Sequence, residues 1–389
     1  MVEERNKRLK IAYLSTEDPG NKHAFSGSSY YMAQALQKYC GDVHAFGPID
    51  SFEKRFIGRA INKGTRHFLR KNTAYDRLVF VAKKHAKIAA RLLAGQPFDV
   101  IVAPVAASEI AFLETDIPIV LIEDATFALL HNYYPGYSNL TGWSARQGNA
   151  IEIAAYKNAS ALLYSSGWAA CSAIKDYQME PQKVFAVPFG ANLDSAPQRE
   201  VALARKKSEH CRLLFIGIGW EKKGGEIAFE TLLRLEEMGL PAELIICGSI
   251  PPAGFTHERM RVIPFLDKND ESQQKKLESL YETADFLLVP TRREAYGIVF
   301  CEASAYGLPS ITTRTGGTSE VVRDGKNGFV LPYHARGKEY AEVIARIYRD
   351  DRRYAELVKS SRDEFEKRLN WDTWGTTVQQ ILRKIIPQV

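Results

Sequence analysis

Short apolar runs alternate with helical patterns along most of this chain, and this alternation constrains the fold more than any other feature. The runs are nearly continuous, which is typical of strands in a parallel sheet that is covered on both faces. In the first half we predict strands over 11–15, 43–46, 98–104, 117–124, 160–166 and 183–189. The rhythm restarts in the second half, with strands predicted over 212–219, 242–249, 261–266, 285–290, 309–313 and 328–332.

Helical patterns separate many of these strands. We predict helices over 26–40, 76–94, 225–239 and 273–284. Asp76 is the candidate N-cap of the second of these helices, and Gly95 follows its last turn. Strand–helix alternation in two blocks of doubly wound size predicts an α/β protein with two Rossmann-like parallel-sheet domains facing each other.

The domain boundaries follow from chain length and from a change in composition. A chain of 389 residues is too long for one ordinary core and suits two domains. Residues 191–209 carry proline, glutamine and charge without core periodicity, as a linker does. We therefore predict an N-terminal domain over 1–190, a hinge-like linker over 191–209, a C-terminal domain over 210–370, and a C-terminal helix over 371–389 that packs across to the N-terminal domain.

The overall composition favours a soluble protein of a reducing compartment. Hydrophobic residues make up 45% of the chain and charged residues 25%, as in globular proteins. The start of the chain is charged, and no apolar stretch approaches the roughly 20 residues of a spanning helix. The five cysteines are scattered and include no C-x-x-C pair. These features predict a cytoplasmic location.

The net charge of +6 is unevenly distributed. Residues 53–91 contain twelve Lys and Arg against Glu53 and Asp76, a local charge of +10. Such a field predicts an anionic partner. Apolar residues lie among the lysines of the helix 76–94, which is compatible with peripheral contact with an anionic membrane and a lipid-linked acceptor, and also with an acidic glycan. Nucleic acid is not expected, because no reader motif accompanies the charge.

Two glutamates bracket an apolar run in EAYGIVFCE, residues 294–302. The segment follows a predicted strand and a short polar turn, where open α/β sheets bind ligands. Gly297 near a helix start allows backbone amides to approach an anion. Glu294 in the loop and Glu302 two turns later would lie too far apart to act together as an acid–base pair. They could instead accept hydrogen bonds from hydroxyl groups at the two ends of a nucleotide-sugar. An amphipathic helix with two exposed acids is the structural alternative.

Residues 290–332, PTRREAYGIVFCEASAYGLPSITTRTGGTSEVVRDGKNGFVLP, resemble the signature region of the retaining glycosyltransferases of family 4, which have the GT-B fold. The E-x7-E spacing is followed in order by G-x-P, GG-x-x-EVV and DG-x-x-G elements. The resemblance implies that Glu294 contacts the donor sugar and Glu302 the ribose hydroxyls. It also implies that the backbone amides of Tyr296, Gly297, Ile298 and Val299 bind the diphosphate.

A glycine-rich turn, FIGIGWEKKGG, occupies residues 215–225. A lysine beside such a turn can hold a diphosphate by charge. The dinucleotide fingerprint G-x-G-x-x-G is not satisfied, which disfavours a Rossmann dehydrogenase. By the resemblance, Gly217 and Lys223 bind the donor, but Ile218 stands where the family usually has an arginine. Lys222, Arg292 and Arg293 are the candidates to replace that charge.

Neither a D-x-D motif nor a histidine pair with metal-binding spacing occurs in the chain, so no metal and no cofactor are expected. The protein's own cations and a helix dipole would neutralise the leaving group. The resemblance further places Leu266, in the FL turn at 265–266, beside the donor base.

The first domain contains fewer residues that indicate a function. By the resemblance, Ser26 and Gly27 stand in place of a glycine-rich loop near the donor and acceptor; an ordinary helix start is the alternative. The strand 117–124 ends in Glu123 and Asp124, which we expect to point into the interdomain cleft, because unused buried carboxylates are costly. Asp124 is the candidate contact for the reacting sugar or acceptor hydroxyl, or else a helix cap. His131 and the tyrosines at 133, 134 and 137 would line an acceptor cleft or pack at its rim.

These observations and the resemblance predict a retaining glycosyltransferase that moves a hexose from a nucleoside-diphosphate sugar to an unidentified acceptor, which is a glycan or other carbohydrate, a lipid-linked molecule or a small molecule. Asp124 and Glu294 would take part in the catalytic step, without a covalent intermediate, because no partnered nucleophile is evident. Two alternatives stay open, namely a GT-B epimerase or hydrolase and a non-catalytic nucleotide-sugar-binding protein.

Overall fold

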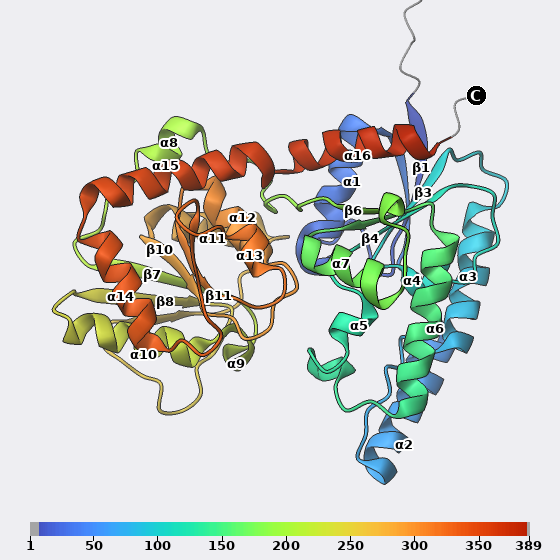
Figure 1. Cartoon of the computed structure of the whole chain (residues 1–389), viewed down its shortest axis with the longest axis horizontal. Coiled ribbons are helices and arrows are strands. Elements are labelled where there is room, and N and C mark those ends of the chain that lie inside the picture. Colours follow the sequence, from blue (N-terminus) through green and yellow to red (C-terminus); the bar gives the residue numbers. More distant parts are fainter. Residues whose placement is uncertain (1–7, 387–389) are drawn as a thin grey trace, which may run out of the picture. The chain divides into compact units, whose positions relative to one another are not determined.

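The computed structural model describes residues 8–386 as two compact units (Figure 1). The first unit comprises the described residues up to Pro188 and those from Trp374 onward, and the second runs from Phe189 to Thr373. The charged start of the chain and the last three residues of the predicted C-terminal helix lie outside the described residues.

The sheet of the first unit has six parallel strands in the order β2-β1-β3-β4-β5-β6. The strands β3, β4 and β5 are buried along their whole length, because helices cover both faces of the sheet (Figure 1). All six predicted strands are confirmed, with ends that differ by a few residues. Their bounds are β1 Leu9–Leu14, β2 Gly41–Phe46, β3 Val100–Pro104, β4 Ile119–Glu123, β5 Ala161–Tyr164 and β6 Val184–Ala186.

The second unit repeats this architecture with the strand order β12-β11-β10-β7-β8-β9, also all parallel. Numbered from 1 to 6 within the unit, these strands follow the order 6-5-4-1-2-3. Read from the opposite edge of the sheet, this is the 3-2-1-4-5-6 order of dinucleotide-binding folds. The six strands predicted here are confirmed as well, and with them the α/β class. Their bounds are β7 Cys211–Ile216, β8 Ala242–Cys247, β9 Met260–Ile263, β10 Phe286–Val289, β11 Ser310–Thr313 and β12 Gly328–Leu331.

Helices connect the strands and pack on both sheets (Figure 1). Those of the first unit are α1 Ser28–Tyr39, α2 Arg59–Leu69, α3 Val79–Leu93, α4 Ala107–Ile110, α5 Phe127–Leu130, α6 Gly142–Asn158 and α7 Gly167–Asp176, together with α16 Trp371–Ile385 from Trp374 onward. Those of the second unit are α8 Arg199–Leu203, α9 Trp220–Lys223, α10 Gly225–Glu237, α11 Glu271–Thr283, α12 Ile298–Ala305, α13 Thr318–Val321, α14 Gly337–Tyr348 and α15 Asp351–Arg368.

Each sheet has one point where the chain reverses the direction in which it adds strands. In the first unit this point lies between β1 and β3, and in the second between β7 and β10. Connections on the two sides of such a point leave toward opposite faces, so the loops at the carboxyl ends of the two strands diverge and leave a crevice. The fold therefore places a ligand site after β1 and β3, and another after β7 and β10.

Two segments extend or correct the expectations. The predicted helix 76–94 begins only at Val79 with Leu78 at its N-cap position, so Asp76 is not the cap. The Asp76 carboxylate instead accepts a hydrogen bond of 2.6 Å from the Tyr137 hydroxyl. Gly95 follows the helix with a φ of 75°, as expected. The segment expected as a linker contains α8, and its Arg199 pairs with Asp363 and Glu366 of α15.

The C-terminal helix α16 packs on α1 within the first unit. The Gln379 side chain donates a hydrogen bond to the Tyr39 carbonyl, and the Cys40 thiol lies 3.8 Å from the Gly375 carbonyl. Trp374, Val378 and Leu382 on the same helix are buried.

The Glu123 side chain is turned into the interior of the first unit, so the expectation that it points outward is wrong. Its carboxylate is buried and accepts a hydrogen bond of 3.3 Å from Tyr156, whose hydroxyl also bonds Glu152. Arg77 forms a buried ion pair with Glu152 at 3.1 Å. Burial raises the pKa of the Glu123 carboxyl well above its usual range, and the neighbouring Glu152 charge raises it further.

This raised pKa predicts how stability depends on pH. Below about pH 4.5 the Glu123 carboxyl binds its proton in both the folded and the unfolded chain. Above that pH the unfolded chain releases the proton while the folded chain retains it, so the free energy of unfolding falls by up to about 1.4 kcal/mol per pH unit. Glu123→Gln removes this loss. Urea unfolding of both proteins from pH 4 to 8 should show the variant gaining relative to wild type as pH rises; parallel curves would contradict the assignment.

A second prediction concerns the packing of α6 on α5. A Cβ at Gly148 would lie 2.2 Å from the Phe127 ring, whereas a Cβ at Gly64 in α2 would meet no atom within 4 Å. Gly148→Ala should therefore destabilise the protein by about 1–3 kcal/mol through overpacking. Gly64→Ala should stabilise it by about 0.5–1 kcal/mol through helix propensity. Urea unfolding measures both, and equal effects of the two substitutions would show that the contact is not tight.

Candidate nucleotide-sugar site

The loops after β7 and β10 bring a lysine and a glutamate together at the reversal point of the second sheet. Lys223 ends the short helix α9, and its ammonium forms an ion pair with the Glu294 carboxylate, 71 residues away. Both side chains are largely buried. The Arg292 amide and the Thr291 hydroxyl donate to the Lys222 carbonyl at 2.8 and 3.2 Å, which ties the two loops to each other. The structure thus joins two residues that the sequence placed in separate motifs.

The glycine-rich turn makes this approach sterically possible. A Cβ at Gly217 would lie 2.9 Å from the Lys223 side chain, which therefore passes directly over the glycine. Gly224 has a φ of 78°, and a Cβ there would lie 2.0 Å from the Pro290 carbonyl oxygen. Side chains at these two positions would separate the β7 loop from the β10 loop and with it Lys223 from Glu294.

The sequence resemblance implies an arginine after the first glycine of this turn, and the chain has Ile218 there. Ile218 is 66% exposed. Among the candidates to supply the charge of the missing arginine, Arg292 already has a partner. It donates a hydrogen bond to the Tyr333 carbonyl at 2.7 Å and stacks on the Tyr333 ring. Arg293 is exposed, and within residues 8–386 its guanidinium has no hydrogen bond or ion pair.

The start of α12 presents backbone amides beside the Lys223–Glu294 pair. Gly297 occupies the N-cap position with a φ of 98°, and a Cβ there would lie 2.6 Å from the Phe300 ring. Ile298 and Val299 are half-buried in the first turn, whose amides have no partner within the helix. Such a terminus attracts anions through its amides and the helix dipole.

Glu302 lies further along α12 and is held by two side chains from other elements. It is 3% exposed, its Oε1 pairs with the Lys268 ammonium, and its Oε2 accepts a hydrogen bond from the Tyr281 hydroxyl. Lys268 follows β9 in the same loop as Leu266, which is half-buried. Sequence analysis missed Lys268 and Tyr281, because neither belongs to a motif; a lysine two residues after the apolar FL turn was the one available signal.

The Tyr296 side chain points away from this surface. Its hydroxyl is buried and donates to the Phe189 carbonyl at 2.9 Å, and burial raises its pKa well above the usual range. The Cys301 thiol lies 3.6 Å from the same carbonyl. Tyr296 therefore offers a ligand its backbone only, which is the contact that the family resemblance implies.

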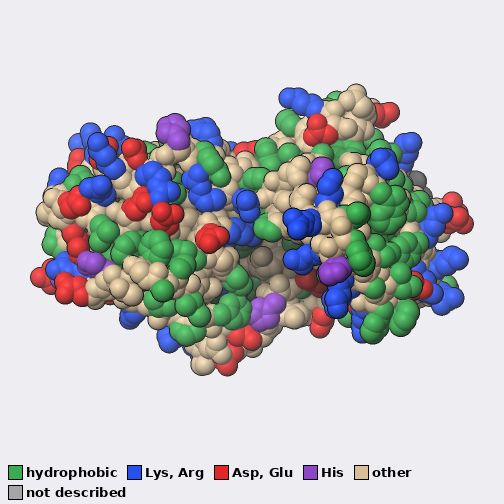
Figure 2. Space-filling view, turned by 90° about the horizontal axis from the view of Figure 1, so that it is seen from below, with side chains coloured by type: hydrophobic (Ala, Val, Ile, Leu, Met, Phe, Trp, Pro, Cys, Tyr) green, Lys and Arg blue, Asp and Glu red, His purple; other side chains and the backbone are tan. Residues whose placement is uncertain are grey.

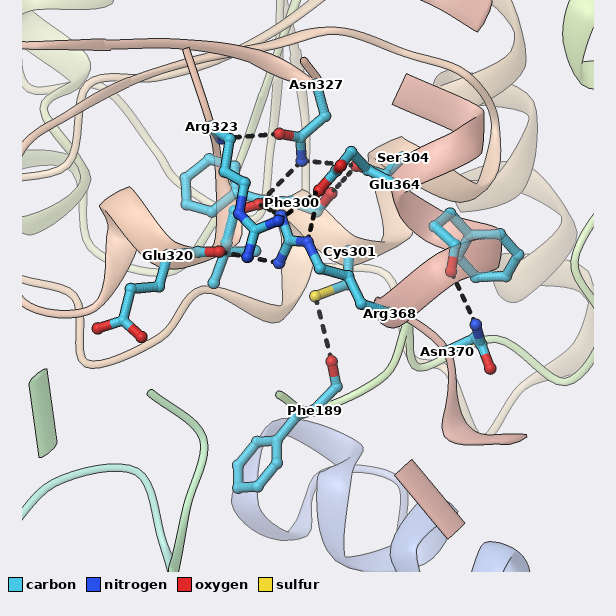
Figure 3. A network of polar contacts seen from close by, with 12 residues as sticks. Phe189, Phe300, Cys301, Ser304, Glu320, Arg323, Asn327, Glu364, Arg368 and Asn370 are labelled. Atoms are coloured by element: carbon cyan, nitrogen blue, oxygen red, sulfur yellow. Dashed lines mark hydrogen bonds and ion pairs between the residues drawn. The ribbon is translucent and has the colours of Figure 1, made fainter. Parts of the chain in front are cut away.

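A polar network behind α12 fixes its position (Figure 3). The Arg368 guanidinium donates to the carbonyls of Glu320 and Val321, both at 2.8 Å, and its Nε pairs with Glu364. The Asn327 amide donates to the Ser304 hydroxyl of α12 at 3.1 Å. The conspicuous EVV and DG-x-x-G segments thus support the helix that carries Glu302 and do not themselves form the candidate site.

The candidate residues of the first unit lie in separate surroundings. Asp124 is half-buried at the carboxyl end of β4. It is not the cap of α5, because the Thr126 hydroxyl takes that role by accepting from the Leu129 amide at 3.3 Å. His131 stacks on Phe127 with 6.2 Å between ring centroids, as expected for packing.

The loop before α1 has an unusual backbone conformation. Ser26 is exposed with a φ of 57°, and Gly27 takes the N-cap position of α1 with a φ of 92°. The preceding Phe25 amide donates to the Glu17 carboxylate at 2.9 Å. The structure therefore places Ser26 and Gly27 in a tight turn near the end of β1.

Within residues 8–386 no group of three or more His, Cys, Asp or Glu could hold a metal ion. No helix among these residues is both long enough and apolar enough to cross a bilayer.

Comparison with known proteins finds a family match within the second unit. Residues 210–350 match the family described as Glycosyl transferases group 1. Similar curated proteins include D-inositol 3-phosphate glycosyltransferases of Corynebacterium efficiens, 25% identical over 66% of this chain, and Acidothermus cellulolyticus, 29% identical over 57%. The chain spans 62% and 52% of the length of these two relatives.

Solved structures extend the likeness to the whole fold. Sucrose-phosphate synthase of Thermosynechococcus elongatus superposes with a TM-score of 0.69 at 16% identity, over 97% of this chain and 99% of that one. The catalytic domain of starch synthase IV from Arabidopsis thaliana, solved with ADP and acarbose, gives 0.66 at 14%, over 98% and 100%. These matches confirm the expected GT-B fold, and the match of residues 210–350 to the glycosyl transferases group 1 family agrees with the resemblance found in the sequence.

Proposed function

We propose that the protein is a glycosyltransferase that moves a hexose from a nucleoside-diphosphate sugar to an acceptor hydroxyl with retention of configuration. The observation that carries this proposal is the Lys223–Glu294 ion pair beside the N-terminus of α12, at the reversal point of a dinucleotide-type sheet. A diphosphate there would take the Lys223 ammonium and the α12 amides as its counter-charges. Glu294 would then be released to accept hydroxyl groups of the donor sugar.

Glu302 and Lys268 are the proposed contacts for the ribose. A carboxylate accepts hydrogen bonds from two vicinal hydroxyl groups well. The Tyr281 hydroxyl orients the Glu302 carboxylate by donating a hydrogen bond to its Oε2. Lys268 keeps the buried carboxylate neutralised while no donor is bound. This pairing explains how an acid that is 3% exposed can be retained without a large cost in stability.

The proposed transfer balances without a protein nucleophile. The acceptor hydroxyl oxygen attacks the anomeric carbon on the face from which the diphosphate leaves. The bond between that carbon and the phosphate oxygen breaks, and the hydroxyl proton passes to a phosphate oxygen. Lys223 and the α12 terminus stabilise the charge that develops there, so no metal ion is required in this proposal. Asp124 is the proposed first-unit contact for the sugar or the acceptor hydroxyl.

The exposed Ile218 supports one rival, a protein that binds a nucleotide-sugar without transferring it. The turn then lacks a second cation beside Lys223 to stabilise the leaving diphosphate, while the ribose and sugar contacts are retained. Donor binding without transfer or hydrolysis would favour this second candidate.

Donor binding is tested by thermal unfolding in EDTA across a panel of nucleoside diphosphates and their sugars. A ligand at about 100 times its Kd should stabilise the protein by about 2.7 kcal/mol and raise the Tm by about 5 °C. Glu302→Ala should abolish the shift, while Glu282→Ala, an exposed acid on α11, should retain it. If no nucleotide raises the Tm of the folded wild type, or if both variants respond as wild type does, the donor site is wrong.

We also propose peripheral contact with an anionic membrane, through the segment 52–69. The π-helical turn Glu53–Gly58 leads into α2, none of whose side chains is buried. Aromatic and aliphatic side chains are exposed beside Arg and Lys on this end of the first unit (Figure 2). The exposed apolar residues of the segment are Phe52, Phe56, Ile57, Phe68 and Leu69. Phe68 is 81% exposed, which a helix in water alone does not favour.

Vesicle co-sedimentation tests this contact. Wild type should bind vesicles of phosphatidylcholine and phosphatidylglycerol more tightly than vesicles of phosphatidylcholine alone, because the basic side chains add electrostatic attraction. Replacing Phe56 and Phe68 by Ser should weaken binding about tenfold or more through loss of apolar burial. Val262→Ser, at an exposed apolar position of the second unit, serves as the control. Equal sedimentation of the three proteins would rule out insertion of this segment.

A further inference from the structure

The candidate donor site of the second unit has less positive charge than a diphosphate requires. The Lys223 ammonium faces the Glu294 carboxylate. Lys268 likewise faces Glu302, so the two pairs together carry no net charge. The N-terminus of α12 adds the equivalent of about half a positive charge. The diphosphate of a nucleotide-sugar is negative at each phosphate, and breaking its bond to the sugar adds a further charge, so the site needs a second cation beside Lys223.

Two successive arginines in the loop between β10 and α12 have different surroundings. The Arg292 guanidinium donates to the Tyr333 carbonyl at 2.7 Å and lies over the Tyr333 ring, 3.6 Å from its centre. Arg293 is exposed, and its guanidinium has no hydrogen bond or ion pair within residues 8–386. Of these two side chains, Arg293 is therefore the one whose guanidinium is available to a ligand.

The backbone at Arg293 is fixed beside the glycine-rich turn. The Thr291 hydroxyl lies within hydrogen-bond distance of the Arg293 and Lys222 carbonyls, at 3.1 and 3.2 Å. The residue after Arg293 is Glu294, whose carboxylate contacts Lys223. Consecutive Cα atoms lie about 3.8 Å apart, so the long Arg293 side chain starts one residue away from this charged pair. The loop thus holds a free guanidinium next to the place where a diphosphate is proposed to bind.

We propose that Arg293 binds the sugar-linked phosphate of the donor and supplies the charge that the glycine-rich turn lacks at Ile218. The inference rests on the proposed function, in which the neighbouring Glu294 accepts hydroxyls of the donor sugar. The planar guanidinium donates to phosphate oxygens through parallel N–H groups. As the acceptor oxygen bonds to the anomeric carbon, the electron pair of the breaking bond stays on the phosphate oxygen, where Arg293 and Lys223 stabilise it. The second cation is then present in the loop after β10, which favours transfer over binding alone.

Calorimetric titration of the full chain in EDTA tests the inference, with UDP, GDP and ADP and the three corresponding monophosphates as probes. The base that wild type binds most tightly is used for the variants. Arg293→Gln should weaken binding of the diphosphate about tenfold or more and that of the monophosphate about threefold or less, because the sugar-linked phosphate is the one it contacts. The ratio of the two affinities therefore falls, whereas a substitution that only disturbed the loop would weaken both nucleotides alike.

Arg346→Gln is the matched control for the loss of one positive charge. Arg346 is exposed and belongs to the last turn of α14. The helix follows the carboxyl end of β12, and Arg346 lies roughly 13 Å along it from its first residue. This variant should bind both nucleotides as wild type does. An equal loss in Arg346→Gln and Arg293→Gln would mean that the net charge of the protein explains the effect, and the inference would be wrong.

Ile218→Arg supplies a second test, which depends on a gain of affinity. It restores an arginine after the first glycine of the turn, so in the Arg293→Gln background it should recover most of the lost diphosphate affinity. In wild type it should improve that affinity by less than about threefold, because Arg293 already provides the charge. Equal gains in the two backgrounds would show that the two positions act independently, which contradicts the inference.

The remaining outcomes separate the inference from the proposed function. If wild type binds a nucleoside diphosphate and Arg293→Gln has an unchanged affinity ratio, the inference is wrong and the donor site stands. If Lys222→Gln lowers the ratio and Arg293→Gln does not, the lysine is the second cation and the inference is again wrong. A folded wild type that binds none of the nucleotides refutes the donor site, and the inference with it.

Discussion

The ion pair between Lys223 and Glu294 depends on two glycines that let backbone and side chain approach more closely than any other residue would allow. Taking two charges out of water is expensive, and the cost is recovered only when the partners are held at contact distance. Gly217 and Gly224 permit that distance, and α12 and its supporting network hold the β10 loop in place. The charge arrangement of the second unit therefore follows from a backbone constraint.

Both sheets have a point where the strand order reverses, but different side chains lie at the two points. At the reversal point of the second sheet, a cation and an acid neutralise each other beside a helix N-terminus. At that of the first, the buried pair of His85 and Glu109 leaves two atoms without partners in the described chain, and the cations of the adjoining cavity come from a peripheral helix. The charges at the reversal point of the second sheet thus neutralise each other, whereas two buried polar atoms at that of the first sheet lack hydrogen-bond partners within the described residues.

The strands and the E-x7-E segment were predictable from the sequence, because burial on both faces and a helix start leave local patterns. The pairing of Glu302 with Lys268 and Tyr281 was not, since its partners come from two other elements and no local pattern connects them. The inward turn of Glu123 was missed for a similar reason: Arg77, Glu152 and Tyr156, which make the interior polar there, are distant in sequence. Sequence pattern identifies elements, while the partners of buried charges require the tertiary structure.

Arg66 and Phe68 lie two residues apart on α2, one lining the cavity at the reversal point of the first sheet and the other exposed to solvent. A helix without buried side chains gains little stability from its own unit, so its position is easily biased by whatever binds it. Any coupling between ligands on the two sides of α2 must then have the same factor in both directions, as thermodynamic reciprocity requires. A surface bound on the Phe68 side would in this way act on the residues beside Arg66 through a single helix.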